Sequence, residues 1–221
     1  MSIDKNSSLG EWASEYAGAS TIFVKNGLDF CCGGMQALEA SCVDKGLDPE
    51  KIMSKVRDFS KGKVAPQWNT MPLDQVIDVI LENYHKKHRE DLQRLIPLAK
   101  KVESVHSDRA ESPQGLGDFL EQLLYELESH MQKEEQILFP MIKSGHGAMA
   151  NGPINVMIHE HVGHGENLVK LKELARNYDL PEDACGSWTA LYQGVSTLER
   201  EVMEHISTEN NILFPKALNG Q

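Results

Sequence analysis

Residues 130–140 read His-Met-Gln-Lys-Glu-Glu-Gln-Ile-Leu-Phe-Pro, and residues 205–215 read His-Ile-Ser-Thr-Glu-Asn-Asn-Ile-Leu-Phe-Pro. Six of the eleven positions are identical without a gap. A shorter pair, His-Lys-Lys-His-Arg-Glu-Asp-Leu at 85–92 and His-Val-Gly-His-Gly-Glu-Asn-Leu at 161–168, is identical at four of eight positions. The two copies of the long segment are 75 residues apart, and those of the short segment are 76 residues apart. The nearly equal spacing indicates a helical hairpin that occurs twice.

The histidine and glutamate of each long copy fall on the apolar face of a predicted helix. Leucines and valines at three- and four-residue spacing lead to His130 and Glu134 in one helix and to His205 and Glu209 in the other. The 3.6-residue period therefore directs all four side chains into the protein interior. A buried carboxylate is strongly unfavourable without a countercharge, and neither apolar stripe contains a lysine or arginine. Metal ions would supply that charge.

Two further predicted helices each bring one histidine to the same level of the interior, which completes a set of four imidazoles and two carboxylates. Two metal ions bridged by both carboxylates would each receive two imidazoles and keep room for an oxo or hydroxo bridge. Nitrogen and oxygen donors without cysteine favour iron, with manganese as the alternative. We therefore expect a non-haem di-iron centre. Its expected ligands are His85, His130, Glu134, His161, His205 and Glu209.

Other polar residues near these positions have simpler interpretations. A single inward histidine is usually a hydrogen-bonded core residue, and only the matched register of the six favours metal binding. His88 and His164 also repeat, and we expect them behind the ligands or at the surface. His106 could approach the site. Glu135 and Glu160 are expected to be solvated acids.

Apolar spacing of three and four residues continues along most of the chain, and no segment alternates as a strand would, so we predict an all-α fold. Long helices are expected at 72–105, 115–144, 153–177 and 184–217. Their short connections favour an up-down four-helix bundle within residues 71–221. Residues 1–62 are expected to form a small helical domain, with the boundary in a polar, proline-containing stretch at 61–70.

The bulk composition limits the function classes. A net charge of −11 opposes binding to nucleic acid and to anionic membranes. No apolar run reaches the roughly 20 residues that span a bilayer, and the polar N-terminus does not resemble a signal peptide. We therefore expect a cytoplasmic protein. Four cysteines are too few for a disulfide framework in a chain of 221 residues, so free thiols are expected.

Cys31 and Cys32 are adjacent in a glycine-flanked turn before a predicted helical stretch at 35–45. A helix N-terminus favours a thiolate, and glycines leave the sulfur atoms accessible, so we expect this pair to be catalytic through redox, nitrosation or iron-accepting chemistry. The alternative is two small buried apolar residues. Neighbouring cysteines do not easily chelate one ion, so a second fixed metal site is not expected. Cys42 and Cys185 are expected to pack in the core.

The order of histidines and glutamates, with Ile-Leu-Phe-Pro after each pair, resembles the haemerythrin-like fold over residues 72–217. The segment Gly-Leu-Asp-Phe-Cys-Cys-Gly-Gly at 27–34 resembles the small domain fused to that fold in the bacterial di-iron proteins for repair of iron centres. Together the two resemblances cover nearly the whole chain.

This resemblance implies repair of iron-sulfur clusters damaged by nitric oxide or peroxide, with the di-iron centre as iron donor or redox partner. The partners would then be damaged iron-sulfur proteins. Related proteins are also linked to nitric oxide chemistry, so nitric oxide reduction, or binding and sensing of nitric oxide or oxygen, is the alternative function. The resemblance leaves open whether the chain is an enzyme, whether it forms a homodimer, which clusters it serves and in which oxidation state the iron is held.

Overall fold

The computed structural model describes residues 3–64, 67–68 and 70–220. Helices make up the regular structure in these ranges, and the β-pairing within them is one isolated bridge between Ser8 and Ala37. The prediction of an all-α fold is confirmed. The expected boundary at 61–70 includes residues 65, 66 and 69, which lie outside the described residues.

The N-terminal unit consists of four short helices around its own apolar core. Ser8 caps the first of them in a capping box with Glu11, and Asp48 caps the last, whose first residue is Pro49. Trp12 is fully buried in the core of this unit. The helices are α1 (Leu9–Glu15), α2 (Ala19–Lys25), α3 (Leu38–Asp44) and α4 (Pro49–Ser60).

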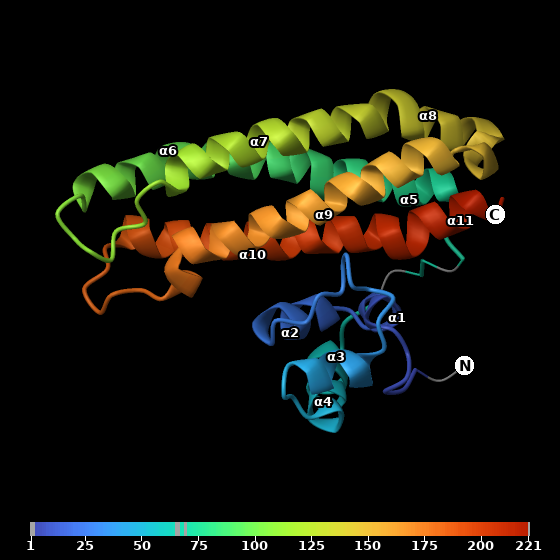
Figure 1. Ribbon diagram of the computed structural model, residues 1–221, viewed down its shortest axis with the longest axis horizontal. Coiled ribbons are helices and arrows are strands. Elements are labelled where there is room, and N and C mark those ends of the chain that lie inside the picture. Colours follow the sequence, from blue (N-terminus) through green and yellow to red (C-terminus); the bar gives the residue numbers. More distant parts are fainter. Residues whose placement is uncertain (1–2, 65–66, 69, 221) are drawn as a thin grey trace.

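The rest of the described chain forms four long, roughly antiparallel helical rods (Figure 1). Each rod corresponds to one of the four predicted long helices. In each rod, π-helical or 3₁₀-helical segments adjoin the α-helices. Their segments are α5 (Leu73–Ile80), η1 (Leu81–His85) and α6 (Lys86–Val105); α7 (Leu116–Lys133), η2 (Glu134–Leu138), α8 (Phe139–Met141), η3 (Ile142–His146) and η4 (Gly147–Met149); α9 (Asn151–Leu174) and η5 (Arg176–Tyr178); and α10 (Gly186–Thr208), η6 (Glu209–Leu213) and α11 (Phe214–Leu218).

Two wide π-helical turns follow from the repeated Phe-Pro. A proline has no N–H for the carbonyl four residues earlier, and its ring would clash with that carbonyl. The helix widens instead, so that the N–H of Phe139 bonds to the carbonyl of Glu134, five residues back. The second copy repeats this bond between Phe214 and Glu209. Each wide turn begins at a glutamate that we expected to bind metal.

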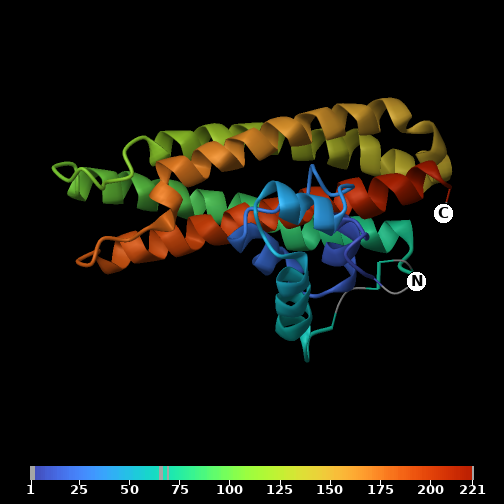
Figure 2. The ribbon, with the colours of Figure 1, turned by 60° about the horizontal axis from the view of Figure 1, so that its bottom comes forward.

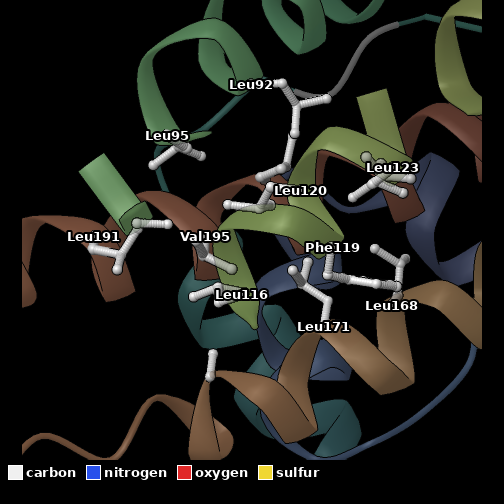
Figure 3. Packing of buried hydrophobic residues seen from close by; sticks show 14 of the residues in the cluster. Leu92, Leu95, Leu116, Phe119, Leu120, Leu123, Leu168, Leu171, Leu191 and Val195 are labelled. Carbon is white, nitrogen blue, oxygen red and sulfur yellow. The ribbon is translucent and has the colours of Figure 1, made fainter. Parts of the chain in front are cut away.

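The bundle interior has two apolar clusters with a polar layer between them. The larger cluster lies toward the α6–α7 connection and includes Leu120, Leu168 and Val195 (Figure 3). The smaller one lies at the opposite end, with Ile77 and Phe214 among its members. The predicted metal ligands occupy the layer between these clusters, where the apolar surroundings exclude water.

The N-terminal unit packs along the side of α10 rather than at an end of the bundle (Figure 2). Its helices α1 and α2 contact α10, and the hydroxyl of Ser20 donates a hydrogen bond to Glu204 on that helix. The turn between α2 and α3, which carries the cysteine pair, points toward the bundle in Figure 1. Within the described residues, no helix is both long enough and apolar enough to cross a membrane.

Leu120→Ala should lower the free energy of unfolding by about 2–5 kcal/mol, because Leu120 is fully buried and its loss leaves a cavity in a close-packed core. Urea unfolding followed by far-UV circular dichroism measures this. Tyr125→Ala on the same helix is the control, because the residue is 77% exposed and should change stability by no more than about 0.5 kcal/mol. Equal losses in the two variants would contradict the assigned core.

Candidate metal centre

The six predicted ligands converge in two overlapping groups in the layer between the apolar clusters. The first group is His85, Glu134, His205 and Glu209, and the second is His130, Glu134, His161 and Glu209. Within each group the potential ligand atoms lie within 4.8 Å of one another. All six residues are buried, and the two glutamates are fully so.

In the first group, two imidazoles face one oxygen from each carboxylate. Nε2 of His85 lies 3.2 Å from Nε2 of His205 and 3.3 Å from Oε2 of Glu134. Nε2 of His205 lies 3.2 Å from Oε1 of Glu209. Two nitrogens bound to one ion at about 2.1 Å, and at a right angle, would be about 3.0 Å apart. The spacing of these nitrogens therefore fits a shared ion.

The second group uses the other oxygen of each carboxylate. Nε2 of His130 lies 3.2 Å from Nε2 of His161 and 3.5 Å from Oε1 of Glu134. Nε2 of His161 lies 3.1 Å from Oε2 of Glu209. Each glutamate thus directs one oxygen to each group, which is the arrangement of a carboxylate that bridges two ions.

The outer ring nitrogens of three histidines are fixed by hydrogen-bond acceptors. Nδ1 of His85 donates to Oε1 of Glu135 at 2.7 Å, and Nδ1 of His161 donates to Oδ1 of Asn210 at 2.9 Å. Nδ1 of His130 donates to Oε2 of Glu160 at 2.9 Å. Since the proton is on Nδ1, each Nε2 presents a lone pair to the centre, as metal-binding histidines do.

The neutral histidines and buried glutamates of this layer favour the binding of cations. Burial lowers the pKa of His85 to about 4 and that of His130 to about 3, so both imidazoles are neutral at pH 7. Burial and then the charge of Glu209 raise the pKa of Glu134 well above its usual range. For Glu209, burial acts to raise the pKa, but the surrounding histidines outweigh it and hold the pKa well below its usual range.

The hydrogen bonding of the two carboxylates gives the clearest test of fit to a metal. Both oxygens of Glu134 and Oε2 of Glu209 are buried without a hydrogen-bond partner among the described residues. The Nε2 lone pairs of His85, His130 and His161 therefore face carboxylate oxygens, which is unfavourable unless a cation, or a proton on Glu134, lies between them. The donor set fits one metal ion in each group.

Three acceptors behind the ligands were not assigned this role from the sequence. Glu135 and Glu160 were expected to be solvated acids, but each holds a ligand histidine and also pairs with a cation, Arg89 at 3.0 Å for Glu135 and Lys133 for Glu160. Their side chains are only 30% and 25% exposed. Glu135 and Asn210 occupy the same position in the two repeats, directly after Glu134 and Glu209, and that match was the available signal.

The remaining histidines divide into two kinds. His106 lies outside the centre, where its ring packs against Trp188 with centroids 4.8 Å apart and its Nε2 is 3.3 Å from Sγ of Cys185. His88 and His164 are instead buried next to the ligands, at 0% and 5% exposure. His88 is enclosed completely, whereas His164 reaches the edge of a surface pocket beside Glu160.

The cysteine turn contacts the bundle at a ligand helix. Cys31 is buried and Cys32 is exposed, with their sulfur atoms 3.8 Å apart. The hydrogen bond from Cys31 to Cys32, together with burial, raises the pKa of Cys31 well above its usual range, and the same hydrogen bond lowers the pKa of Cys32. The thiol of Cys32 lies 3.3 Å from the backbone carbonyl of His161. The carboxylate of Asp29 shapes the turn by accepting hydrogen bonds from three successive backbone N–H groups.

Two asparagines of the second repeat join this turn to the centre. Nδ2 of Asn210 donates to the carbonyl of Cys31 at 3.2 Å, while its Oδ1 holds His161. Nδ2 of Asn211 donates to the carbonyl of Phe30 at 3.2 Å. The first repeat has Glu-Gln at these positions, so the difference between the copies coincides with the contact to the N-terminal unit.

Comparison with known proteins gives two matched families and several close relatives. Residues 76–217 match the Hemerythrin HHE cation binding domain, and residues 5–59 match the ScdA_N domain, described as a domain of unknown function (DUF542). The "Iron-sulfur cluster repair protein YtfE" of Citrobacter koseri is 46% identical over 213 residues, which cover 96% of this chain and 97% of the relative. The proteins of the same name from an Enterobacter species and from Escherichia coli are 47% and 46% identical over the same shares.

Glu134→Leu should remove most of the bound metal while the helices remain, because leucine suits an apolar interior but cannot bridge two ions. Metal analysis of the purified variant, with far-UV circular dichroism, checks both statements. Glu121→Leu on the same helix is the control, since that side chain is 52% exposed and should leave the metal content unchanged. Full metal content in the Glu134 variant would exclude Glu134 as a bridging ligand.

Proposed function

We propose that this chain, which belongs to the haemerythrin HHE family and to the iron-sulfur cluster repair proteins that carry this domain, repairs damaged iron-sulfur clusters. The iron for this repair would be held in its bundle. Its partners would be proteins whose clusters nitric oxide or peroxide has damaged. The observation that carries the proposal is the pair of fully buried glutamates, each with one oxygen directed to each group of histidines.

The metal in this proposal is a pair of iron ions. His85 and His205 would bind one, His130 and His161 the other, and Glu134 would bridge both together with Glu209. Imidazole and carboxylate donors without sulfur suit iron, and the binuclear arrangement leaves space for an oxo or hydroxo bridge. When bound, the pair supplies iron and reducing equivalents. The protein supplies neutral imidazoles fixed from behind by Glu135, Glu160 and Asn210.

Donation of iron requires that each ion remain exchangeable. Each group offers two imidazole nitrogens and two shared carboxylate oxygens, which is fewer protein donors than an octahedral ion can bind. Hydrogen bonds also connect the centre to the cysteine turn, from His161 through Asn210 to the backbone carbonyl of Cys31. We therefore place the exchange with a damaged protein on the side of the N-terminal unit.

The cysteine pair is the proposed catalytic element on that side. Cys32 is exposed and has the lower pKa, so it is suited to contact iron or a nitrosated group on the partner, while the buried Cys31 hydrogen-bonds to it. The two sulfur atoms are 3.8 Å apart, so both could contact one ion. The adjacency of the cysteines in the sequence had not led us to expect this. Asp29 lies in the same group of potential ligand atoms.

A second candidate function is reduction of nitric oxide, or binding and sensing of nitric oxide or oxygen, at the same centre. The incomplete protein coordination of each ion supports this alternative, because it leaves positions for a small molecule. Turnover of nitric oxide to nitrous oxide by the reduced, metal-loaded protein would favour it over repair. The names of the relatives favour repair.

Reduced protein loaded with ⁵⁷Fe should restore an iron-sulfur enzyme whose cluster has been nitrosylated, and the label should appear in the repaired cluster. The assay contains no added iron, and client activity and ⁵⁷Fe transfer are both measured. The metal-free form of the chain should restore little activity. Equal restoration by the metal-free protein would rule out iron donation.

Cys31→Ala combined with Cys32→Ala should keep the metal content and optical spectrum but lower the rate of cluster repair, because neither sulfur is in the two groups of metal ligands. The matched control is Cys42→Ala, since Cys42 is buried in the N-terminal core away from the turn. Loss of iron from the double variant would contradict this division between metal storage and thiol chemistry.

A further inference from the structure

Two buried histidines beside the centre have no assigned role. His88 and His164 are the second histidines of the short repeat, three residues after His85 and His161. They lie on the inward faces of α6 and α9, at 0% and 5% exposure. The duplicated position indicates a role that both halves of the bundle share.

Neither imidazole is satisfied by the protein. Both ring nitrogens of His88 and both ring nitrogens of His164 are buried without a hydrogen-bond partner among the described residues. A buried N–H without an acceptor is unfavourable, and natural proteins rarely keep one without a reason.

Each unsatisfied ring lies against a ligand of a different metal position. The ring of His88 packs on that of His205 in the first group, with centroids 5.3 Å apart. The ring of His164 packs edge-on against that of His130 in the second group, with centroids 5.0 Å apart. Each metal position therefore has one free imidazole next to it.

The side of His88 away from the centre is apolar, whereas His164 also lines a surface pocket with Glu126 and Glu160, neither of which hydrogen-bonds to its ring. One helical turn further on, α6 and α9 carry Leu92 and Leu168, both buried in the larger apolar cluster. Leu127 and Val202 of the same cluster precede His130 and His205 by one turn. The acceptor left for the N–H of His88 is therefore on the side of the metal positions, and the repeat indicates the same side for His164.

We propose that His88 and His164 donate hydrogen bonds to a small anionic or diatomic ligand bound at the open positions of the metal pair, one histidine serving each ion. The ligand class includes azide and nitric oxide. The terminal atom of such a molecule would accept a hydrogen bond from the imidazole N–H. The proposal rests on the metal centre of the proposed function but not on repair itself.

Azide is the probe for this role, with the oxidised, metal-loaded protein. His88→Phe and His164→Phe should each retain the full iron content but bind azide about 10- to 100-fold more weakly, because a hydrogen bond to a charged ligand is lost. The antisymmetric stretch of bound azide in the infrared spectrum should shift as well. His88→Gln and His164→Gln, which keep a donor, should recover part of both effects.

His106→Gln is the matched control, because this histidine contacts Trp188 and Cys185 outside the centre and should leave azide binding unchanged. Unchanged affinity and infrared stretch in both phenylalanine variants would overturn the proposal and leave these histidines as packing residues. Loss of iron in those variants would also overturn it, because the histidines would then be ligands. Absence of iron from the unmodified protein would instead defeat the proposed function, so the two failures are distinguishable.

Discussion

Two carboxylates share a buried layer of this bundle, and no lysine or arginine among the described residues pairs with them. Glu134 and Glu209 are fully buried, and three of their four oxygens lack a hydrogen bond among the described residues. Three of the four inner imidazole nitrogens cannot compensate, because their rings carry the proton on the outer nitrogen, and His205 reaches only Oε1 of Glu209. Bound cations would compensate the buried carboxylate charge. Within the described residues, the apolar clusters on either side offer no cationic group that could do so.

The duplicated hairpin explains both the symmetry of the centre and the point where that symmetry ends. In both halves a Phe-Pro pair widens the helix at the bridging glutamate, and the next residue holds a histidine from the neighbouring helix. That residue is Glu135 in the first half, where it also meets Arg89. It is Asn210 in the second half, where it also binds the cysteine turn. In the first half this residue forms an ion pair with Arg89, and in the second half it hydrogen-bonds to the N-terminal unit.

The sequence predicted the inward face of each helix well, because the 3.6-residue period and the repeat register are local properties. The six residues that converge in the two groups, and the order of the long helices, could be stated from these patterns. The hydrogen bonds behind the ligands could not, because Glu135 and Glu160 look like ordinary surface acids until the neighbouring helix is in place. The same holds for the cysteine turn, whose contact with His161 depends on how the N-terminal unit packs on α10. A position between two helices is set by tertiary packing, which no single helical period encodes.

Mössbauer spectroscopy of ⁵⁷Fe-enriched protein, purified without air and combined with metal analysis, tests the central claim most directly. The account predicts two iron ions per chain, in sites of nitrogen and oxygen ligation, that couple magnetically through their bridges. A chain that holds no stoichiometric transition metal would contradict it. So would isolated, uncoupled iron, because both buried glutamates would then lack the second cation that their geometry requires.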